Sequence, residues 1–223
     1  MPEVVSEGRR SINNLQRSAS LFLVKTVFTA VLALVCIFMP PYPFIPIQMS
    51  LISTTVIGIP SFVLALEPNH ERVRGNFLAN VLARSLPASA AIVCSLFLEL
   101  ALGRLLDHSF AEISTVCMVL TIVVGLALIY RISRPLTPLR AALLGAMIGL
   151  VALSYTVFGD FFRVVRLPID VGVFTIALSV ASVALFEALS RRFLGGYERS
   201  RAFARMVSFV EGEGAKREER VSR

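Results

Sequence analysis

The chain has 223 residues, of which 56% are hydrophobic and only 17% are charged, and its mean hydropathy is +0.75. These values exclude an ordinary soluble domain and favour a membrane protein. The net charge of +7 comes from scattered basic residues, and a sequence with no Trp and four Tyr argues against a nucleic-acid partner. We therefore expect the lipid bilayer as a partner, with the basic residues near its anionic inner leaflet.

Six segments have the roughly 20 apolar residues that a membrane span requires. We expect an all-α polytopic protein in which residues 1–18 form a short cytoplasmic stalk helix and residues 19–190 form a six-helix transmembrane bundle. Residues 191–223 are expected to be a basic cytoplasmic tail, with a short surface helix near 197–210. The first span is not a signal peptide, because a polar segment precedes it and no small-residue cleavage site follows. The predicted spans are 19–39, 48–66, 84–105, 113–130, 138–158 and 171–190.

The arginines predict the orientation of these spans. They concentrate before the first span, after every second span and at the start of the tail, and the positive-inside rule makes these segments cytoplasmic. The loop 159–170 is a partial exception, since it holds Arg163 and Arg166 beside two aspartates. Both termini are therefore expected on the cytoplasmic side. The arginines that carry this prediction are Arg9, Arg10, Arg17, Arg72, Arg74, Arg84, Arg131, Arg134, Arg140, Arg191 and Arg192.

The second predicted span has a glycine, a proline and several hydroxyl side chains in its middle. Pro60 has no amide hydrogen for the carbonyl of Val56, which becomes free to accept from another donor or to contact a cation. Broken transmembrane helices of this kind often form ion sites in transporters.

This segment resembles the sixth transmembrane helix of P-type cation pumps, which has the pattern P-x-Q-(x)9-G-x-P-(x)7-P. Residues 7–14, E-G-R-R-S-I-N-N, resemble the G-R-x-(x)2-N-N segment that joins the phosphorylation domain of these pumps to their fifth membrane helix. The wording of both segments is most similar to the bacterial cation-transporting ATPase E group. The residues that match the first pattern are Pro46, Gln48, Gly58, Pro60 and Pro68.

The resemblance implies that the chain is the carboxy-terminal membrane half of such a pump, with its fifth to tenth helices, in a bacterial plasma membrane. The sequence contains neither the D-K-T-G phosphorylation motif nor the T-G-D-G-x-N-D hinge motif of these pumps. The complete pump would use ATP and Mg, and its amino-terminal half would be a partner. A truncated gene, a late start codon and a split enzyme would each explain such a chain.

The candidate cation path lies on the first two spans. Lys25, Thr26 and Thr29 share one helical face, and Ser53 and Thr54 lie on a second hydroxyl-bearing face. The hydroxyl groups could instead hydrogen-bond between packed helices, and Lys25 could extend to the cytoplasmic headgroups. The resemblance implies a functional Lys25, because a lysine of the gastric proton pump occupies the matching position. The candidate residues are Lys25, Thr26, Thr29, Ser53, Thr54, Val56, Gly58 and Pro60.

The carboxylate ligands of the calcium-pump pattern are absent from the matching positions. The asparagine and glutamate of its fifth helix fall on Thr26 and Thr29, and the acid of its sixth helix falls on Ile57. Hard cations such as Ca²⁺ prefer six to eight oxygen ligands, typically including carboxylates. No metal ligand and no catalytic residue is therefore assigned, and the identity of the cation stays open.

The remaining ionisable residues give weaker signals. Glu99 lies near the outer end of the third span, and Glu187 is expected to pair with Arg191 at i, i+4. His70 and His108 fall in opposite loops, which argues against a paired-histidine metal site. The three cysteines all lie in predicted spans and are expected to be small buried side chains rather than disulfides or metal ligands. They are Cys36, Cys94 and Cys117.

These observations favour the membrane part of an ATP-driven P-type cation transporter, calcium being one candidate cargo, that forms half of the ion path. This chain by itself is predicted to lack ATPase activity. Two alternatives remain at this point: a self-standing six-helix binding or regulatory membrane protein, and a passive channel.

Overall fold

The computed structural model describes residues 2–38, 40–67 and 77–197, and the side chains of residues 8, 11–38, 40–67 and 77–193. Every regular element in these ranges is helical, and six helical segments are long and apolar enough to cross a membrane. The prediction of an all-α protein with six transmembrane helices is confirmed. The expected surface helix over 197–210 lies outside the described residues, apart from Tyr197.

The helices are longer than the predicted spans at most of their ends. The predicted stalk and the first span form one continuous helix, α1 (Pro2–Phe38), and the third span starts seven residues earlier than expected, as α4 (Phe77–Leu105). Because hydropathy marks only the apolar part of a helix, polar turns at both ends escape detection. The remaining elements are α2 (Pro46–Ile52), η1 (Ser53–Gly58), α3 (Ile59–Leu66), α5 (Phe110–Ile132), α6 (Pro138–Thr156) and α7 (Ile169–Tyr197).

Local sequence signals fix several helix starts. Ser109 caps α5 by accepting the amide hydrogen of Glu112 (3.3 Å), and the Glu112 carboxylate accepts from the Ser109 amide (2.7 Å). Thr137 caps α6 by accepting the amide hydrogen of Arg140 (3.4 Å), and Pro138 occupies the first helical position.

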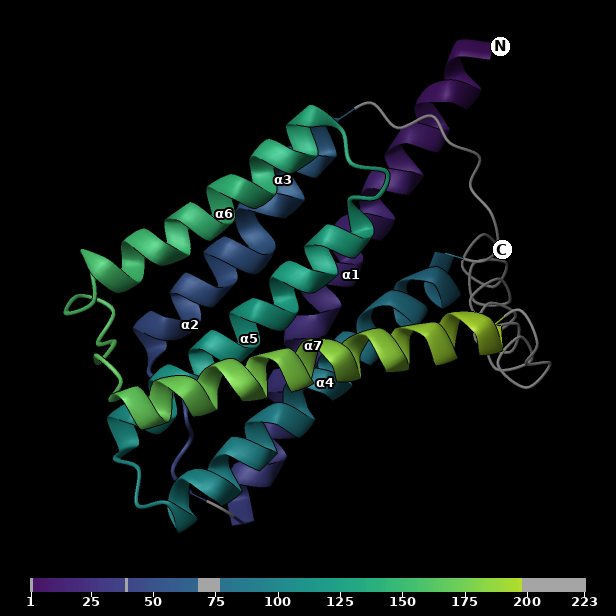
Figure 1. The fold of residues 1–223 in the computed structure, drawn as a ribbon. Helices are drawn as coiled ribbons and strands as arrows, with labels where there is room; N and C mark the ends of the chain where they lie inside the picture. Colours follow the sequence, from purple (N-terminus) through teal and green to yellow (C-terminus); the bar gives the residue numbers. More distant parts are fainter. Residues whose placement is uncertain (1, 39, 68–76, 198–223) are drawn as a thin grey trace, which may run out of the picture.

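The helix α5 lies in the middle of the bundle (Figure 1). The helix α4 packs against α1, α5 and α7, and α6 lies beside the α2–η1–α3 segment. Small residues permit these close approaches: a β-carbon on Gly125 of α5 would lie 2.5 Å from the side chain of Val56 on η1. Hydroxyl groups add contacts between helices, because Ser95 donates to Ser182 on α7 (2.6 Å).

Contacts between loops agree with alternating spans. At one end of the bundle Arg104 donates to the carbonyl of Pro40 (2.6 Å), and Gln48 donates to the carbonyl of Arg163 (3.4 Å). At the other end Arg140 at the start of α6 contacts Glu67 at the end of α3. The loops expected outside therefore share one end, and the Glu67 contact marks the opposite end.

Candidate functional site in the α1 and α2 to α3 interface

Lys25 and Ser53 meet across the interface between α1 and η1. The Lys25 ammonium donates to the Ser53 hydroxyl oxygen at 2.6 Å, and this hydroxyl donates to the carbonyl of Met49 at 2.6 Å. The ammonium thus points to the helix break rather than along α1 toward its amino-terminal end. A half-buried cationic group is held next to hydroxyl and carbonyl oxygens within a membrane-spanning segment.

The helix break is a π-helical turn. The residues Ser53–Gly58 have π geometry, and the Ile59 amide donates to the carbonyl of Thr54, five residues earlier. The predicted break is a change of helical register, and the chain stays helical through Ser53–Gly58. In the π register the residue five before Pro60 is Thr55, so the proline ring lies where a donor to that carbonyl would otherwise be.

The other predicted residues do not converge with this pair. The hydroxyl of Thr26 donates to the carbonyl of Phe22 on its own helix (3.1 Å), and that of Thr29 donates to the carbonyl of Lys25 (2.6 Å). Thr54 and Gly58 are exposed, whereas Val56 and Pro60 are buried. The hydroxyls of Thr26 and Thr29 are therefore satisfied within α1 and do not form an oxygen cage with Ser53.

No group of three or more His, Cys, Asp or Glu side chains within the described residues is arranged to hold a metal ion. The positive charge of Lys25 and the neutral oxygens around it are the groups this interface offers. The interface therefore places one ammonium group beside neutral hydroxyl and carbonyl oxygens.

Two buried polar anchors, near the two ends of the α2–η1–α3 segment, were not predicted. The side chain of Gln48 is fully buried, and its amide oxygen accepts from the hydroxyl of Ser114 on α5 (2.6 Å) and from the amide of Ile45 (3.3 Å). A glutamine inside a predicted span is itself a signal of such a contact, since unpaired polar groups are costly in hydrocarbon. This anchor fixes the start of α2 against α5.

The second anchor is the Glu67 cluster, formed by Glu67, Arg140, Arg17, Asn14 and Thr137. The Glu67 carboxylate accepts from Arg140 Nε (2.6 Å) and from the Thr137 hydroxyl (3.1 Å), and Arg17 lies 3.5 Å away. Asn14 donates to the backbone carbonyl of Glu67 (3.2 Å). The cluster joins the first part of α1 to the end of α3 and the start of α6. The available signal was the acid directly before Pro68, at the end of an apolar segment.

The acids singled out from the sequence have different surroundings. Glu99 is fully buried, with its Oε1 atom 3.6 Å from His108 Nδ1. The predicted pair between Glu187 and Arg191 is confirmed at 3.9 Å, but the closer partner of Glu187 is Arg131 on α5, at 2.9 Å. The described cysteines are free, and Cys94 is exposed, contrary to the expectation that all three are buried.

Sequence comparison relates the chain to bacterial ion pumps. It is 35% identical over 158 residues to the probable cation-transporting ATPase exp7 of Streptococcus pneumoniae serotype 4, which covers 67% of this chain. It is also 35% identical over 158 residues to the calcium-transporting ATPase CtpE of Mycobacterium tuberculosis, which covers 64% of this chain. The chain spans about 20% of the length of each of these relatives. No protein-family model matches the chain.

Proposed function

Since this chain is a homologue of one part of the bacterial cation-transporting ATPases, we propose that it is the membrane-embedded part of an ATP-driven cation transporter and forms half of the ion path. The observation that carries the proposal is the contact of Lys25 with Ser53 at the π-helical turn. A membrane-embedded ammonium costs about 2.5–3.5 kcal/mol on insertion scales. A functional role for Lys25 would explain why this cost is tolerated, and such a role agrees with the names of the relatives, which describe cation transport.

In this proposal Lys25 acts as an internal counter-cation. Its ammonium occupies the oxygens of Ser53 and the π-helical turn when no cargo is present. An arriving cation competes for those oxygens and repels the ammonium, so the two charges occupy the place alternately. The carboxylates that a divalent cargo requires would come from the remaining part of the pump, and calcium is a candidate cargo only with them.

Phosphorylation is assigned to that remaining part as well. The complete pump would use ATP and Mg, and this chain carries no D-K-T-G sequence. We expect the purified chain to show no ATP hydrolysis and no hydroxylamine-sensitive label after incubation with radioactive ATP. A labelled aspartyl phosphate on this polypeptide would refute the assignment.

A chimera tests the transport role. Residues 2–193 replace the matching segment of the Mycobacterium tuberculosis CtpE pump, and ATP-driven cation uptake is measured in inverted vesicles. We expect uptake by the chimera, and a loss of about fivefold or more on Lys25→Met or Pro60→Ala, within the range of typical coupling energies. Equal uptake by Lys25→Met at equal expression would remove Lys25 from the path.

The control substitutions are chosen by exposure. Val31 on α1 and Phe62 on α3 are 36% and 67% exposed, so Val31→Ala and Phe62→Ala open no cavity within this chain. Leu32 and Leu64 would be poor controls, because both are 1% exposed and their truncation would itself weaken packing.

The same proposal places this chain in a bacterial plasma membrane, with both of its termini on the cytoplasmic side. In a cysteine-free background, we expect Leu106→Cys to react with an impermeant thiol reagent from outside and Leu136→Cys to be protected. The two leucines are matched in exposure, at 56% and 48%. The reverse labelling pattern would invert the topology.

Two measurements in vesicles separate the passive channel and the regulatory protein from the proposed transporter. A passive channel would dissipate a cation gradient across vesicles that contain this chain alone, without ATP. A regulatory protein would leave the chimera inactive while altering the activity of an intact pump added to the same vesicles.

A further inference from the structure

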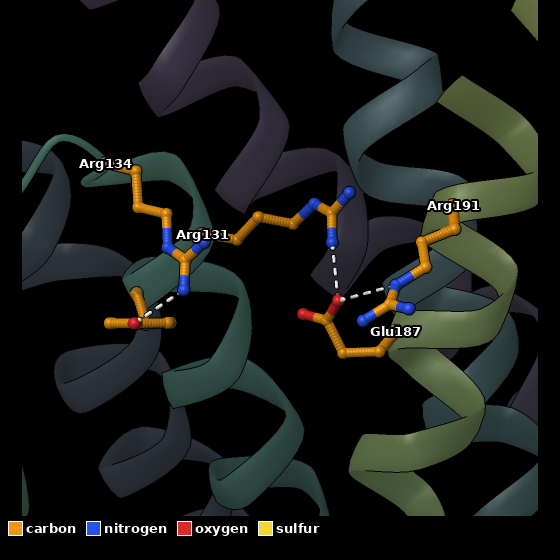
Figure 2. A pocket seen from close by; sticks show the side chains of 5 residues that line it. Arg131, Arg134, Glu187 and Arg191 are labelled. Carbon is orange, nitrogen blue, oxygen red and sulfur yellow. Dashed lines mark hydrogen bonds and ion pairs between the residues drawn. The ribbon is translucent and has the colours of Figure 1, made fainter. Parts of the chain in front are cut away.

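A basic pocket lies between α5 and α7, far from the Lys25 site along the sequence. Its volume is about 460 Å³, and all of its lining side chains are polar or aromatic. They come from the last turn of α5, the segment directly after it and the carboxy-terminal part of α7 (Figure 2). The lining residues are Tyr130, Arg131, Arg134, Glu187 and Arg191.

The charges in this pocket do not balance. Three guanidinium groups face one carboxylate, which leaves an excess of two positive charges. Glu187 lies between two of the arginines in Figure 2 and accepts from Arg131 at 2.9 Å, with Arg191 Nε at 3.9 Å. Glu187 therefore positions one arginine from each helix but neutralises only one of them.

Arg134 has a different partner. Its Nη2 atom donates to the Tyr130 hydroxyl at 2.6 Å, and its guanidinium carbon lies 4.6 Å from the centre of the Tyr130 ring. No carboxylate among the described side chains pairs with it. Since a guanidinium has five N–H donors, each arginine keeps donors for a ligand at the pocket.

This arrangement fits a phosphate group. Guanidinium forks bind phosphate oxygens in pairs, and the Arg131 fork is already oriented by Glu187. The pocket lies at the same end of the bundle as the arginine-rich loops, where Tyr130 has the amphipathic character of residues at the membrane interface. Leu136 and Leu185, 48% and 37% exposed, lie close in sequence to the lining residues and offer apolar surface. Basic pockets between transmembrane helices on the cytoplasmic side bind anionic lipid headgroups.

We propose that Arg131, Arg134 and Arg191 form a site for the phosphate of an anionic phospholipid in the cytoplasmic leaflet. The lipid links the ends of α5 and α7. Free phosphate shares this chemistry but brings no acyl chains, so the test separates the two sources. The site is independent of the proposed cation path.

Native mass spectrometry of the purified full chain in detergent is the test. The chain is titrated with phosphatidylglycerol, with phosphatidylcholine of the same acyl chains, and separately with inorganic phosphate. We expect phosphatidylglycerol to bind about thirtyfold more tightly than phosphatidylcholine, which corresponds to about 1 kcal/mol for each of the two excess basic residues. Binding of inorganic phosphate in preference to phosphatidylglycerol would overturn the lipid assignment.

Variants locate the binding. Arg134→Ala breaks no described ion pair and is expected to lower the affinity for phosphatidylglycerol several-fold. Arg131→Ala/Arg134→Ala is expected to bind phosphatidylglycerol no more tightly than phosphatidylcholine. Glu187→Gln removes a competing anion and is expected to raise the affinity. The matched control Arg163→Ala/Arg166→Ala loses two exposed arginines at the opposite end and should bind like the wild type. Unchanged binding by Arg131→Ala/Arg134→Ala, or an equal loss in the control, would refute the site.

Discussion

The helices α1 and α5 are almost equally apolar but differ greatly in burial. The most apolar windows of their spans have mean hydropathies of 2.5 and 2.4, yet 22% of the α1 window and 72% of the α5 window are buried. The helix α5 is surrounded by its neighbours, whereas α1, which carries Lys25, lies at the edge of the bundle and leaves Thr26 exposed. An edge position leaves one side of the candidate path open to further helices, as the proposed function requires.

The largest loss of stability is expected from the Glu67 cluster, which joins α1 to the ends of α3 and α6. Glu67→Gln removes the carboxylate from the buried Glu67 cluster and leaves Arg17 and Arg140 with uncompensated charge, which should cost about 3–5 kcal/mol. Reversible unfolding in mixed micelles measures the change. The control Glu187→Gln affects an ion pair whose carboxylate side chain is 37% exposed and should cost less than about 1 kcal/mol. Equal costs would mean that apolar packing alone holds α1.

A matched pair of leucines tests the comparison directly. Leu128 on α5 is 1% exposed and Leu34 on α1 is 63% exposed. We expect Leu128→Ala to lower the free energy of unfolding by about 2 kcal/mol, through lost packing, and Leu34→Ala to change it by less than about 0.5 kcal/mol. A large cost at Leu34 in the chain alone would show that α1 is covered on the side described as exposed.

The close contact between Gly125 on α5 and Val56 on η1 predicts the next largest loss of stability. Gly125→Ala adds a methyl group 2.5 Å from Val56 and should cost about 1–2 kcal/mol by displacing the π-helical turn. Gly149→Ala on α6 meets nothing within 4 Å and should be neutral or slightly stabilising. In the chimera, Gly125→Ala should also reduce uptake, because the turn that it displaces contains Ser53. Unaltered stability would argue against the contact between α5 and η1.

The smallest effect is a single interhelical hydrogen bond. Ser95→Ala removes the bond to Ser182 between α4 and α7 and should cost about 0.6 kcal/mol, the average for such bonds in membranes. Ser95→Ala/Ser182→Ala should cost little more than the single change, since each hydroxyl also bonds to its own helix. Strictly additive losses in a double-mutant cycle would exclude a direct interaction.

The sequence by itself determined the class of fold, the number of membrane-spanning helices and the position of the helix break. Hydropathy over about 20 residues is a local property, and Pro60 acts on the turn directly before it, so neither needs tertiary information. The sequence also placed Lys25 and Ser53 on adjacent spans, which made their contact a reasonable expectation. It could not separate α1 from α5, because a lipid-facing leucine and a buried leucine have the same hydropathy.

Only the tertiary structure decided which polar residues meet. Glu67 and Arg140 are separated by 73 residues, and Arg131 and Glu187 by 56, so no periodicity within one helix links them. The π register at Ser53–Gly58 was likewise not predicted from the sequence. Helix packing places these groups within hydrogen-bonding distance. Because an unpaired polar group is costly in a membrane, the paired arrangement is then the favoured one.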